Sequence, residues 1–312
     1  MTCRDELKFS GLGLRSAILL RGLVPAPAGC VGDPMQLGLI AGNGRFPFLA
    51  LEAARRLGHE VVVVAIKGET SPALATVAAI EPVAPLHWVS LGQLGKCIAI
   101  LRRAGVTRAV MAGQVKHTKL FADIRPDFTG MKLLGRLTTR NTDAVISVVA
   151  DVLSEHGIEL EDSTAFLRSL LAGSGVLTSR SPSEEELADL EFGYAVADAI
   201  ATLDVGQTIV VKRQAVVAVE AMEGTDAVIE RAGALVGPGV SIIKVAKPSQ
   251  DMRFDVPVVG LSTLAVMAKV GAAVLSLDAN RALVLDGERF FTEANAKALT
   301  VVGRDGQQRD DG

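Results

Sequence analysis

The chain has 312 residues, of which 49% are hydrophobic, 21% charged and 4% aromatic, and its formal net charge is -3. The length predicts two domains, and the composition is that of a globular rather than a disordered chain. The small net charge and few aromatic side chains argue against nucleic-acid binding. Three scattered cysteines exclude a disulfide scaffold or a zinc site and indicate a reducing, cytoplasmic setting; they are Cys3, Cys30 and Cys97.

Residues 1–35 differ from the rest, and we expect a disordered extension or a wrongly chosen start codon there. The apolar stretch 16–24 is too short to span a bilayer and is interrupted by Arg21. A signal peptide cleaved near residues 26–28 is the alternative, which Arg21 and the prolines disfavour. Met35 directly precedes the first predicted strand and would be a natural first residue.

The N-terminal half alternates strands with helices. Continuous apolar runs predict buried strands, and apolar residues at helical spacing that end at a glycine predict helices. The predicted strands are 37–41, 60–66, 108–112 and 158–160, and the predicted helices are 48–57, 94–104 and 143–155. Strand–helix–strand units with short connections predict a parallel sheet with right-handed crossovers. We therefore expect a Rossmann-like domain over residues 36–165.

The C-terminal half predicts a second, mixed α/β domain over residues 166–303, followed by a tail at 304–312. The run 181–184 (SPSE) predicts a capping box with proline at the first helical position, opening a helix that ends near Thr202. Further strands are predicted at 207–212, 215–221, 241–246, 256–259, 273–277 and 282–285, and further helices at 226–235, 264–270 and 287–298. A ligand cleft between the two domains is the default site.

The loop after the first strand is glycine-rich and is a candidate phosphate site. Gly42, Asn43, Gly44 and Arg45 lie between a strand and a helix, where backbone N–H groups and the helix dipole attract anions. Pro47 stands where the dinucleotide fingerprint requires a third glycine, and no aspartate ends the second strand, which disfavours NAD. From these residues alone, a phosphate site and a purely structural turn are equal alternatives.

A second candidate is the acidic turn at 220–226. Glu220 leaves its strand on the face opposite the valines. Glu223 and Asp226 flank a glycine, and Thr225 can cap the following helix. Carboxylates at such a turn can hold Mg²⁺ or orient a water molecule. The alternative, favoured by these residues alone, is that Asp226 complements the helix dipole and the glutamates are solvated.

The loop 244–255 is the third candidate, because it concentrates both signs of charge between two strands. Basic side chains neutralise pyrophosphate oxygens, while aspartates bind a cation or direct water. The loop contains Lys244, Lys247, Gln250, Asp251, Arg253 and Asp255. The alternative is an exposed charged loop. The run 116–119 adds a basic spot, in which His117 is expected to be a surface residue rather than a base.

Four motifs that occur in this order resemble the LpxI family, the UDP-2,3-diacylglucosamine pyrophosphatases of lipid A biosynthesis. They are AGNGRFP at 41–47, LDVGQ at 203–207, AVEAMEGTDA at 218–227 and KPSQDMRFDVP at 247–257, and the resemblance covers about residues 37–303. It implies hydrolysis of UDP-2,3-diacylglucosamine to UMP and 2,3-diacylglucosamine 1-phosphate (lipid X). It also implies two α/β domains that clasp the lipid, a catalytic C-terminal domain, Mg²⁺ and a homodimer. The location would be cytoplasmic, with at most peripheral association with the inner membrane.

The resemblance also assigns roles to single residues. Asp226 matches the family's essential aspartate, which makes it the leading catalytic candidate, either binding Mg²⁺ or aligning water. The implied metal ligands are Asp226, Asp251 and Asp255. The implied substrate-binding residues are Gly42, Asn43, Gly44, Arg45, Glu223, Thr225, Lys247, Gln250 and Arg253.

Two segments depart from the family pattern. Residues 140–143 (RNTD) lack one carboxylate while keeping Asp143, and residues 113–118 (GQVKHT) lack an arginine–proline pair. Where these segments touch substrate, we expect its preference to differ from that of typical members. Two other functional classes stay open, a Rossmann-type oxidoreductase or sugar-nucleotide enzyme and a non-catalytic lipid or nucleotide carrier. The missing third glycine counts against the first class, and the unused carboxylates count against the second.

Overall fold

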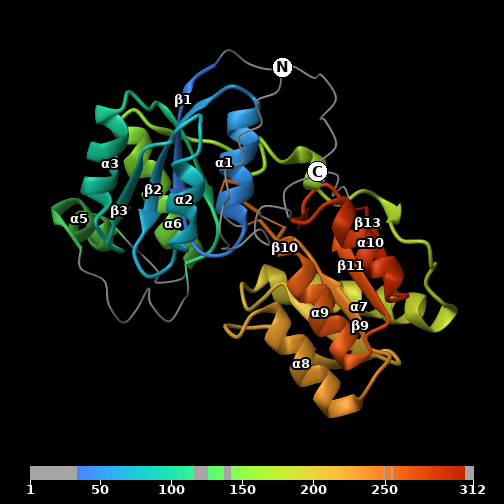
Figure 1. Ribbon diagram of the computed structural model, residues 1–312. Helices are drawn as coiled ribbons and strands as arrows, with labels where there is room; N and C mark the ends of the chain where they lie inside the picture. Colours follow the sequence, from blue (N-terminus) through green and yellow to red (C-terminus); the bar gives the residue numbers. More distant parts are fainter. Residues whose placement is uncertain (1–33, 116–125, 137–141, 249, 254–255, 306–312) are drawn as a thin grey trace, which may run out of the picture.

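The structure, a computed structural model, describes residues 34–115, 126–136, 142–248, 250–253 and 256–305. Two α/β domains follow one another along the chain, the first coloured blue to green and the second yellow to red (Figure 1). Each domain is built around one main sheet. Within the described ranges, no helix is both long enough and apolar enough to cross a membrane.

The first domain contains a five-stranded parallel sheet in the order β3-β2-β1-β4-β5. Its strands are β1 (Gln36–Ala41), β2 (Glu60–Ile66), β3 (Leu86–Val89), β4 (Arg108–Ala112) and β5 (Glu159–Leu160). Its helices are α1 (Phe46–Arg56), α2 (Ala73–Ala78), α3 (Leu94–Arg103), α5 (Phe128–Arg136) and α6 (Thr142–Glu155). The predicted Rossmann-like parallel sheet is confirmed.

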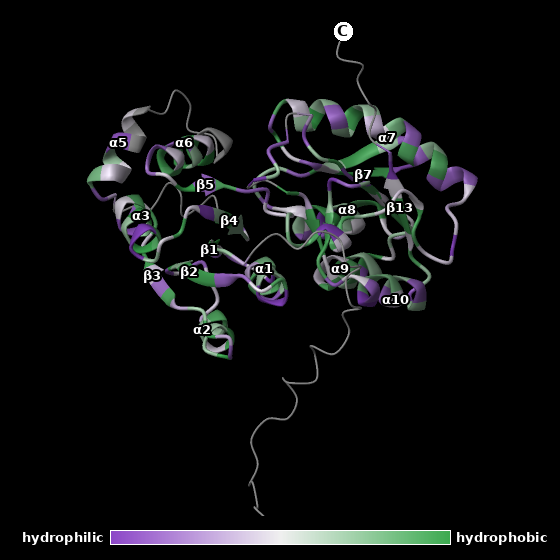
Figure 2. Ribbon diagram, turned by 90° about the horizontal axis from the view of Figure 1, so that it is seen from above, coloured by the Kyte–Doolittle hydropathy of each residue, from purple (hydrophilic) through white to green (hydrophobic). Residues whose placement is uncertain are grey.

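Strands β1 and β2 are apolar at successive positions because helices cover both faces of the sheet. Leu39 and Val63 pack into one buried cluster together with residues of α1 and α2. Ile40 and Val62 pack into another cluster together with residues of α3 and α6. Figure 2 shows these two helix layers on opposite sides of the sheet. A strand buried on both faces has no alternating pattern, which explains the continuous apolar runs.

The second domain contains a six-stranded sheet in the order β6-β13-β11-β9-β7-β8 and a separate β10–β12 pair. Its strands are β6 (Gly175–Val176), β7 (Thr208–Lys212), β8 (Ala215–Val219), β9 (Ser241–Lys244), β10 (Val258–Val259), β11 (Val274–Asp278), β12 (Leu283–Val284) and β13 (Thr300–Arg304). Its helices are α7 (Glu184–Thr202), α8 (Thr225–Val236), α9 (Leu261–Val270) and α10 (Glu288–Ala296). Helix α7 covers one face, and α8, α9 and α10 cover the other.

The direction of the strands decides where the polar residues of this domain meet. Strands β9, β11 and β13 run parallel, and β8 runs in the same direction because β8 and β9 both pair antiparallel with β7. The carboxyl ends of these four strands therefore lie at one edge of the sheet. In α/β proteins, ligands usually bind outside this edge.

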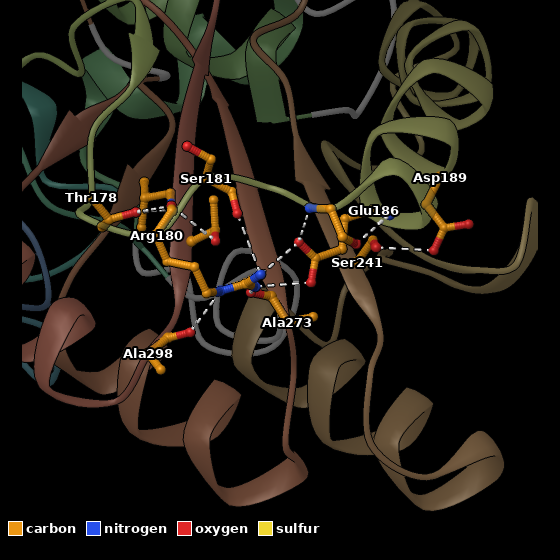
Figure 3. Close-up of polar contacts among 11 residues, drawn as sticks. Thr178, Arg180, Ser181, Glu186, Asp189, Ser241, Ala273 and Ala298 are labelled. Atoms are coloured by element: carbon orange, nitrogen blue, oxygen red, sulfur yellow. Dashed lines mark hydrogen bonds and ion pairs between the residues drawn. The ribbon is translucent and has the colours of Figure 1, made fainter.

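Arg180 ties the segment before α7 to the sheet, as Figure 3 shows. Its guanidinium donates to both carboxylate oxygens of Glu186, at 3.0 and 2.8 Å. It also donates to the carbonyl oxygens of Ala273, at 2.8 Å, and Ala298, at 3.0 Å. These bonds join the first turn of α7 to the connections that precede β11 and β13.

The capping box at the start of α7 is displaced from the predicted position. The N-cap is Ser183, whose hydroxyl accepts from the Glu186 N–H while the Glu186 carboxylate accepts from the Ser183 N–H. Pro182 therefore precedes the helix and is not its first residue. The motif requires a glutamate three residues after the cap, and Ser183 satisfies this spacing with Glu186.

The two domains pack against each other through apolar side chains. Val256 and Leu283 of the second domain share a buried cluster with Leu49 of α1. After β5, the Ser163 N–H donates to the Met252 carbonyl at 2.9 Å. The loop that follows β9 therefore contacts the first domain directly. The predicted ligand cleft between the domains stays a prediction.

Most predicted elements are present, with ends shifted by a few residues. The largest shift in a helix start is that of α9, which begins at Leu261 rather than at residue 264. The elements α2, β3, α5, β6 and β13 were not predicted. The predicted N-terminal extension lies outside the described residues, except for its last two positions.

Gly303 allows β13 to approach the segment before β6, and we expect its replacement to destabilise the second domain. A Cβ atom at Gly303 would lie 1.7 Å from the Gly173 carbonyl oxygen. Because backbone atoms would have to move, Gly303→Ala should lower the free energy of unfolding by about 2–3 kcal/mol, measured by urea unfolding. Gly135→Ala is the control, since a Cβ there meets no atom of the described residues within 4 Å. Equal stability of the two variants would contradict this prediction.

Candidate active site

Polar side chains gather where the strands of the second sheet end at their shared edge. Glu220 follows β8, Lys244 ends β9, Asp278 ends β11 and Arg304 ends β13. The buried Asp278 accepts from Arg304 Nε at 2.7 Å and from the Ala246 N–H at 2.8 Å. These two bonds fix the beginning of the loop after β9. At this edge of the second sheet, charged side chains therefore lie beside a backbone that hydrogen bonds hold in place.

A buried polar cluster anchors the start of α8. Lys244 Nζ donates to the hydroxyl oxygen of Thr225 at 2.8 Å and to that of Thr208 at 3.3 Å. The Thr225 hydroxyl in turn donates to Glu220 Oε1 at 2.9 Å. The side chains of Lys244 and Glu220 are 7% and 10% exposed, and Lys244 Nζ lies 3.9 Å from Glu220 Oε2. This cluster fixes Thr225, the residue that precedes Asp226.

Asp226 lies in the first turn of α8 and is partly exposed. The N-cap is Gly224, with φ of 87°, and it makes no side-chain cap. The first N–H groups of a helix lack partners within the helix and carry partial positive charge, which favours a nearby anion. Thr263 of α9 donates its hydroxyl proton to Asp226 Oδ1 at 3.0 Å. An oriented carboxylate at an uncapped helix start can align water or hold a cation beside a phosphate.

The side chain of Glu223 binds to its own turn and to α8. Its Oε2 accepts from the Ala221 N–H at 3.0 Å, and its Oε1 accepts from Arg231 Nη2 at 2.7 Å. Bonds to backbone N–H groups and the Arg231 guanidinium hold the pKa of Glu223 below its usual value. Glu223 thus shapes the turn before Asp226, and its contact with substrate stays a prediction.

The loop after β9 brings together two of the motifs recognised in the sequence. Lys247 Nζ forms an ion pair with Asp204 Oδ1 at 2.6 Å, which joins the 203–207 and 247–257 segments. The Gln250 side-chain oxygen accepts from the Lys247 N–H at 2.9 Å, and Arg281 donates to the Lys247 carbonyl at 2.7 Å. Lys247 is therefore held in one place by neighbours on both sides.

Asp251 and Arg253 pair with each other within this loop. The Arg253 guanidinium donates to both carboxylate oxygens of Asp251, the shortest distance being 2.6 Å. These bonds to Arg253 hold the pKa of Asp251 below its usual value. The third predicted metal ligand, Asp255, lies outside the described residues, as do 116–119 and 140–141. Asp143 lies in α6, and its side chain is not among those described.

The glycine loop of the first domain packs tightly against the end of β4. A Cβ atom at Gly42 would lie 2.7 Å from the Gln114 carbonyl oxygen, and one at Gly113 would lie 2.2 Å from the Asn43 carbonyl oxygen. The Asn43 N–H donates to the Gln114 carbonyl at 2.7 Å. Gly44 has φ of 86°, a conformation that favours glycine. Close packing of two loops therefore accounts for glycine at 42 and 113, and phosphate binding here stays a prediction.

Arg45 extends from this loop to the second domain. Its guanidinium pairs with the carboxylate of Asp286, whose side chain is only 4% exposed. The Asp286 Oδ2 atom also accepts from the Leu261 N–H at 2.9 Å, in the first turn of α9. Arg45, predicted to bind substrate, is thus connected to the helix turn that also carries Thr263.

We expect Asp286→Ala to lower the free energy of unfolding by about 1–2 kcal/mol, because the first turn of α9 loses its acceptor. Arg45→Met removes the same ion pair but keeps the bond to the Leu261 N–H. It also leaves the Asp286 carboxylate, whose side chain is only 4% exposed, without the Arg45 charge, so it should cost about 3 kcal/mol, more than Asp286→Ala. Thermal unfolding of both variants measures the difference. A loss in Arg45→Met no larger than that in Asp286→Ala would contradict this expectation.

Several residues of this region were not singled out in the sequence, including Asp278 and Arg304 at the strand ends. Thr208, Thr263 and Asp286 contact the candidate site through bonds to Lys244, Asp226 and Arg45. None of them lies in a recognisable motif, and each partner is more than 30 residues away in the chain. In the sequence, these three residues are distinguished only by their position next to the end of a strand or helix. Many surface residues have such a position, so it does not identify a site.

The donor set can be compared with what Mg²⁺ requires. Among the described residues, no three His, Cys, Asp or Glu side chains converge as a ready metal site. Mg²⁺ is commonly held by one or two carboxylates, water and substrate phosphates, so a complete protein cage is not needed. The partly exposed Asp226 carboxylate fits this requirement, whereas Asp251 is engaged by Arg253.

Both halves of the chain match the models of one known protein family. The family model of the LpxI N-terminal domain matches residues 36–170, and that of the LpxI C-terminal domain matches residues 173–302. The UDP-2,3-diacylglucosamine pyrophosphatase LpxI of Caulobacter vibrioides is 32% identical over 286 residues. This alignment covers 88% of the present chain and 99% of the relative.

Proposed function

The chain belongs to the LpxI family, and we infer that it hydrolyses the pyrophosphate bond of UDP-2,3-diacylglucosamine in lipid A biosynthesis. The products would be UMP and 2,3-diacylglucosamine 1-phosphate. The observation that carries this inference is the position of Asp226. It lies at the uncapped start of α8, oriented by Thr263 and placed beside a buried polar cluster.

Hydrolysis of a pyrophosphate requires in-line attack of water on phosphorus and stabilisation of the charge on the phosphate oxygens. We assign the alignment of the attacking water or the binding of Mg²⁺ to Asp226. Lys247 and Arg253 would supply positive charge to the phosphate oxygens, and Asp204 and Asp251 hold these two side chains in place. The first-turn N–H groups of α8 would add partial positive charge.

Mg²⁺ when bound would neutralise the pyrophosphate oxygens and polarise the phosphorus. Asp226 is the residue that fits as its ligand, and Asp251 and Asp255 are the further candidates. A homodimer and peripheral contact with the inner membrane also follow from the resemblance, as proposals. Light scattering of the purified protein and flotation with phospholipid vesicles would test these two points.

The activity is tested by incubating the purified full chain with UDP-2,3-diacylglucosamine and measuring UMP, with Mg²⁺ or with excess EDTA. We expect UMP with Mg²⁺ and little with EDTA. A UDP-sugar without acyl chains is the control for substrate class and should release much less UMP. A folded protein that releases no UMP from the diacylated substrate would refute the proposed activity. Full activity in EDTA would refute the proposed requirement for Mg²⁺.

A further inference from the structure

The carboxylate of Asp226 receives a hydrogen bond from a different helix. Thr263 of α9 donates its hydroxyl proton to Asp226 Oδ1 at 3.0 Å, although the two residues are 37 positions apart. Thr263 is 4% exposed, whereas Asp226 is partly exposed. A buried hydroxyl therefore donates to the carboxylate of a partly exposed residue at the candidate site.

Helix packing fixes the position of Thr263. Helices α8 and α9 pack side by side through Ile229, Leu264 and Met267, which share one buried cluster. The first turn of α9 is held by Asp286, which accepts from the Leu261 N–H. The Thr263 hydroxyl is thus carried by a helix whose face and first turn are both constrained. Because the position of the Thr263 hydroxyl is fixed, its hydrogen bond can favour one rotamer of the Asp226 side chain.

We propose that Thr263 is a positioning residue, which orients the Asp226 carboxylate for the reaction. The proposal rests on the proposed function, in which Asp226 aligns water or holds a cation. The hydrogen bond engages Oδ1 and thereby fixes the direction of Oδ2, the second oxygen that can contact the reacting water or the cation. Misplacement of a catalytic group by about 1 Å can slow a reaction about 100-fold, so one hydroxyl at this position has a measurable effect.

Three variants distinguish the effect of the Thr263 hydroxyl from the effect of the shape of this side chain. Thr263→Val removes the hydroxyl and keeps the branched shape, Thr263→Ser keeps the hydroxyl, and Ser262→Ala removes an exposed neighbouring hydroxyl. We expect kcat for UMP release to fall at least about tenfold in the valine variant, with KM changed less than about twofold. The serine variant should keep kcat within about threefold of the unchanged protein, and Ser262→Ala should be unchanged.

A second measurement does not depend on activity. Crystal structures of the valine and serine variants should show the Asp226 side chain displaced, or in several rotamers, only in the valine variant. If the valine variant does not fold, Thr263→Ala replaces it in both measurements. The proposal is overturned if a folded variant without the hydroxyl keeps kcat within threefold, or if Asp226 stays in place. If the unchanged protein releases no UMP, the proposed function fails, and the Asp226 rotamer alone decides the positioning role.

Discussion

The Asp226→Asn variant is expected to release UMP about 10³-fold more slowly than the unchanged protein, with Mg²⁺ present. The replacement removes the negative charge but keeps the size of the side chain. The amide oxygen of asparagine can still accept from the Thr263 hydroxyl, which preserves the orientation seen at 3.0 Å. The loss therefore reports the charge of the carboxylate rather than its position.

Glu230→Gln is the matched control for this variant. Glu230 lies on the same helix and is 48% exposed, where it pairs with Lys269. Removing its charge should leave UMP release within about twofold, because it lies one helical turn after Asp226, in an exposed ion pair with Lys269. Circular dichroism would show whether both variants are folded. A loss of less than tenfold in folded Asp226→Asn would mean that another group performs the assigned step.

Much of the fold could be predicted because its central strands are buried on both faces. The apolar runs of β1 and β2 admit only a covered parallel strand or a buried helix, and their short length favours the strand. Strand β3 was missed because it has four residues, is half exposed and lies at the edge of its sheet. Its conformation depends on pairing with β2, and the local amino-acid sequence does not reveal this pairing.

The candidate site could be predicted only where its residues are consecutive. The turn that contains Asp226 and the loop that contains Lys247 are dense in charge. For both segments, the resemblance to the family favoured a functional site over an exposed charged surface. Thr263 could not be found in this way, because it is one threonine in an apolar helix and its partner is distant in the chain. Its role depends on how α9 packs against α8.

The glycine loop illustrates a different limit. A glycine permits close approach of the backbone, and the sequence does not say whether a ligand or another segment of the chain approaches. At Gly42 the approaching group is the Gln114 carbonyl of the chain itself. Arg45, in the same loop, contacts Asp286 across the domain boundary. The phosphate hypothesis for this loop therefore needs a measurement of its own.

The Lys244→Met variant is expected to lose about 3–5 kcal/mol of the free energy of unfolding, measured by urea unfolding. Lys244 lies between Thr208, Thr225 and Glu220, and its side chain is 7% exposed. Without it, the Glu220 carboxylate stays buried and loses its ion pair with Lys244. Within the described residues, Glu220 Oε2 is already buried without a hydrogen bond, and Lys244 Nζ lies 3.9 Å away from it.

A double variant separates the buried charge from the lost packing. Glu220→Gln combined with Lys244→Met removes both charges while keeping an oxygen that accepts from the Thr225 hydroxyl. If the uncompensated carboxylate causes the loss, the double variant should recover most of the stability of the unchanged protein. Lys269→Met breaks the exposed pair with Glu230 and should cost less than about 1 kcal/mol. A double variant as unstable as the single one would attribute the loss to packing and to the two threonine hydroxyls instead.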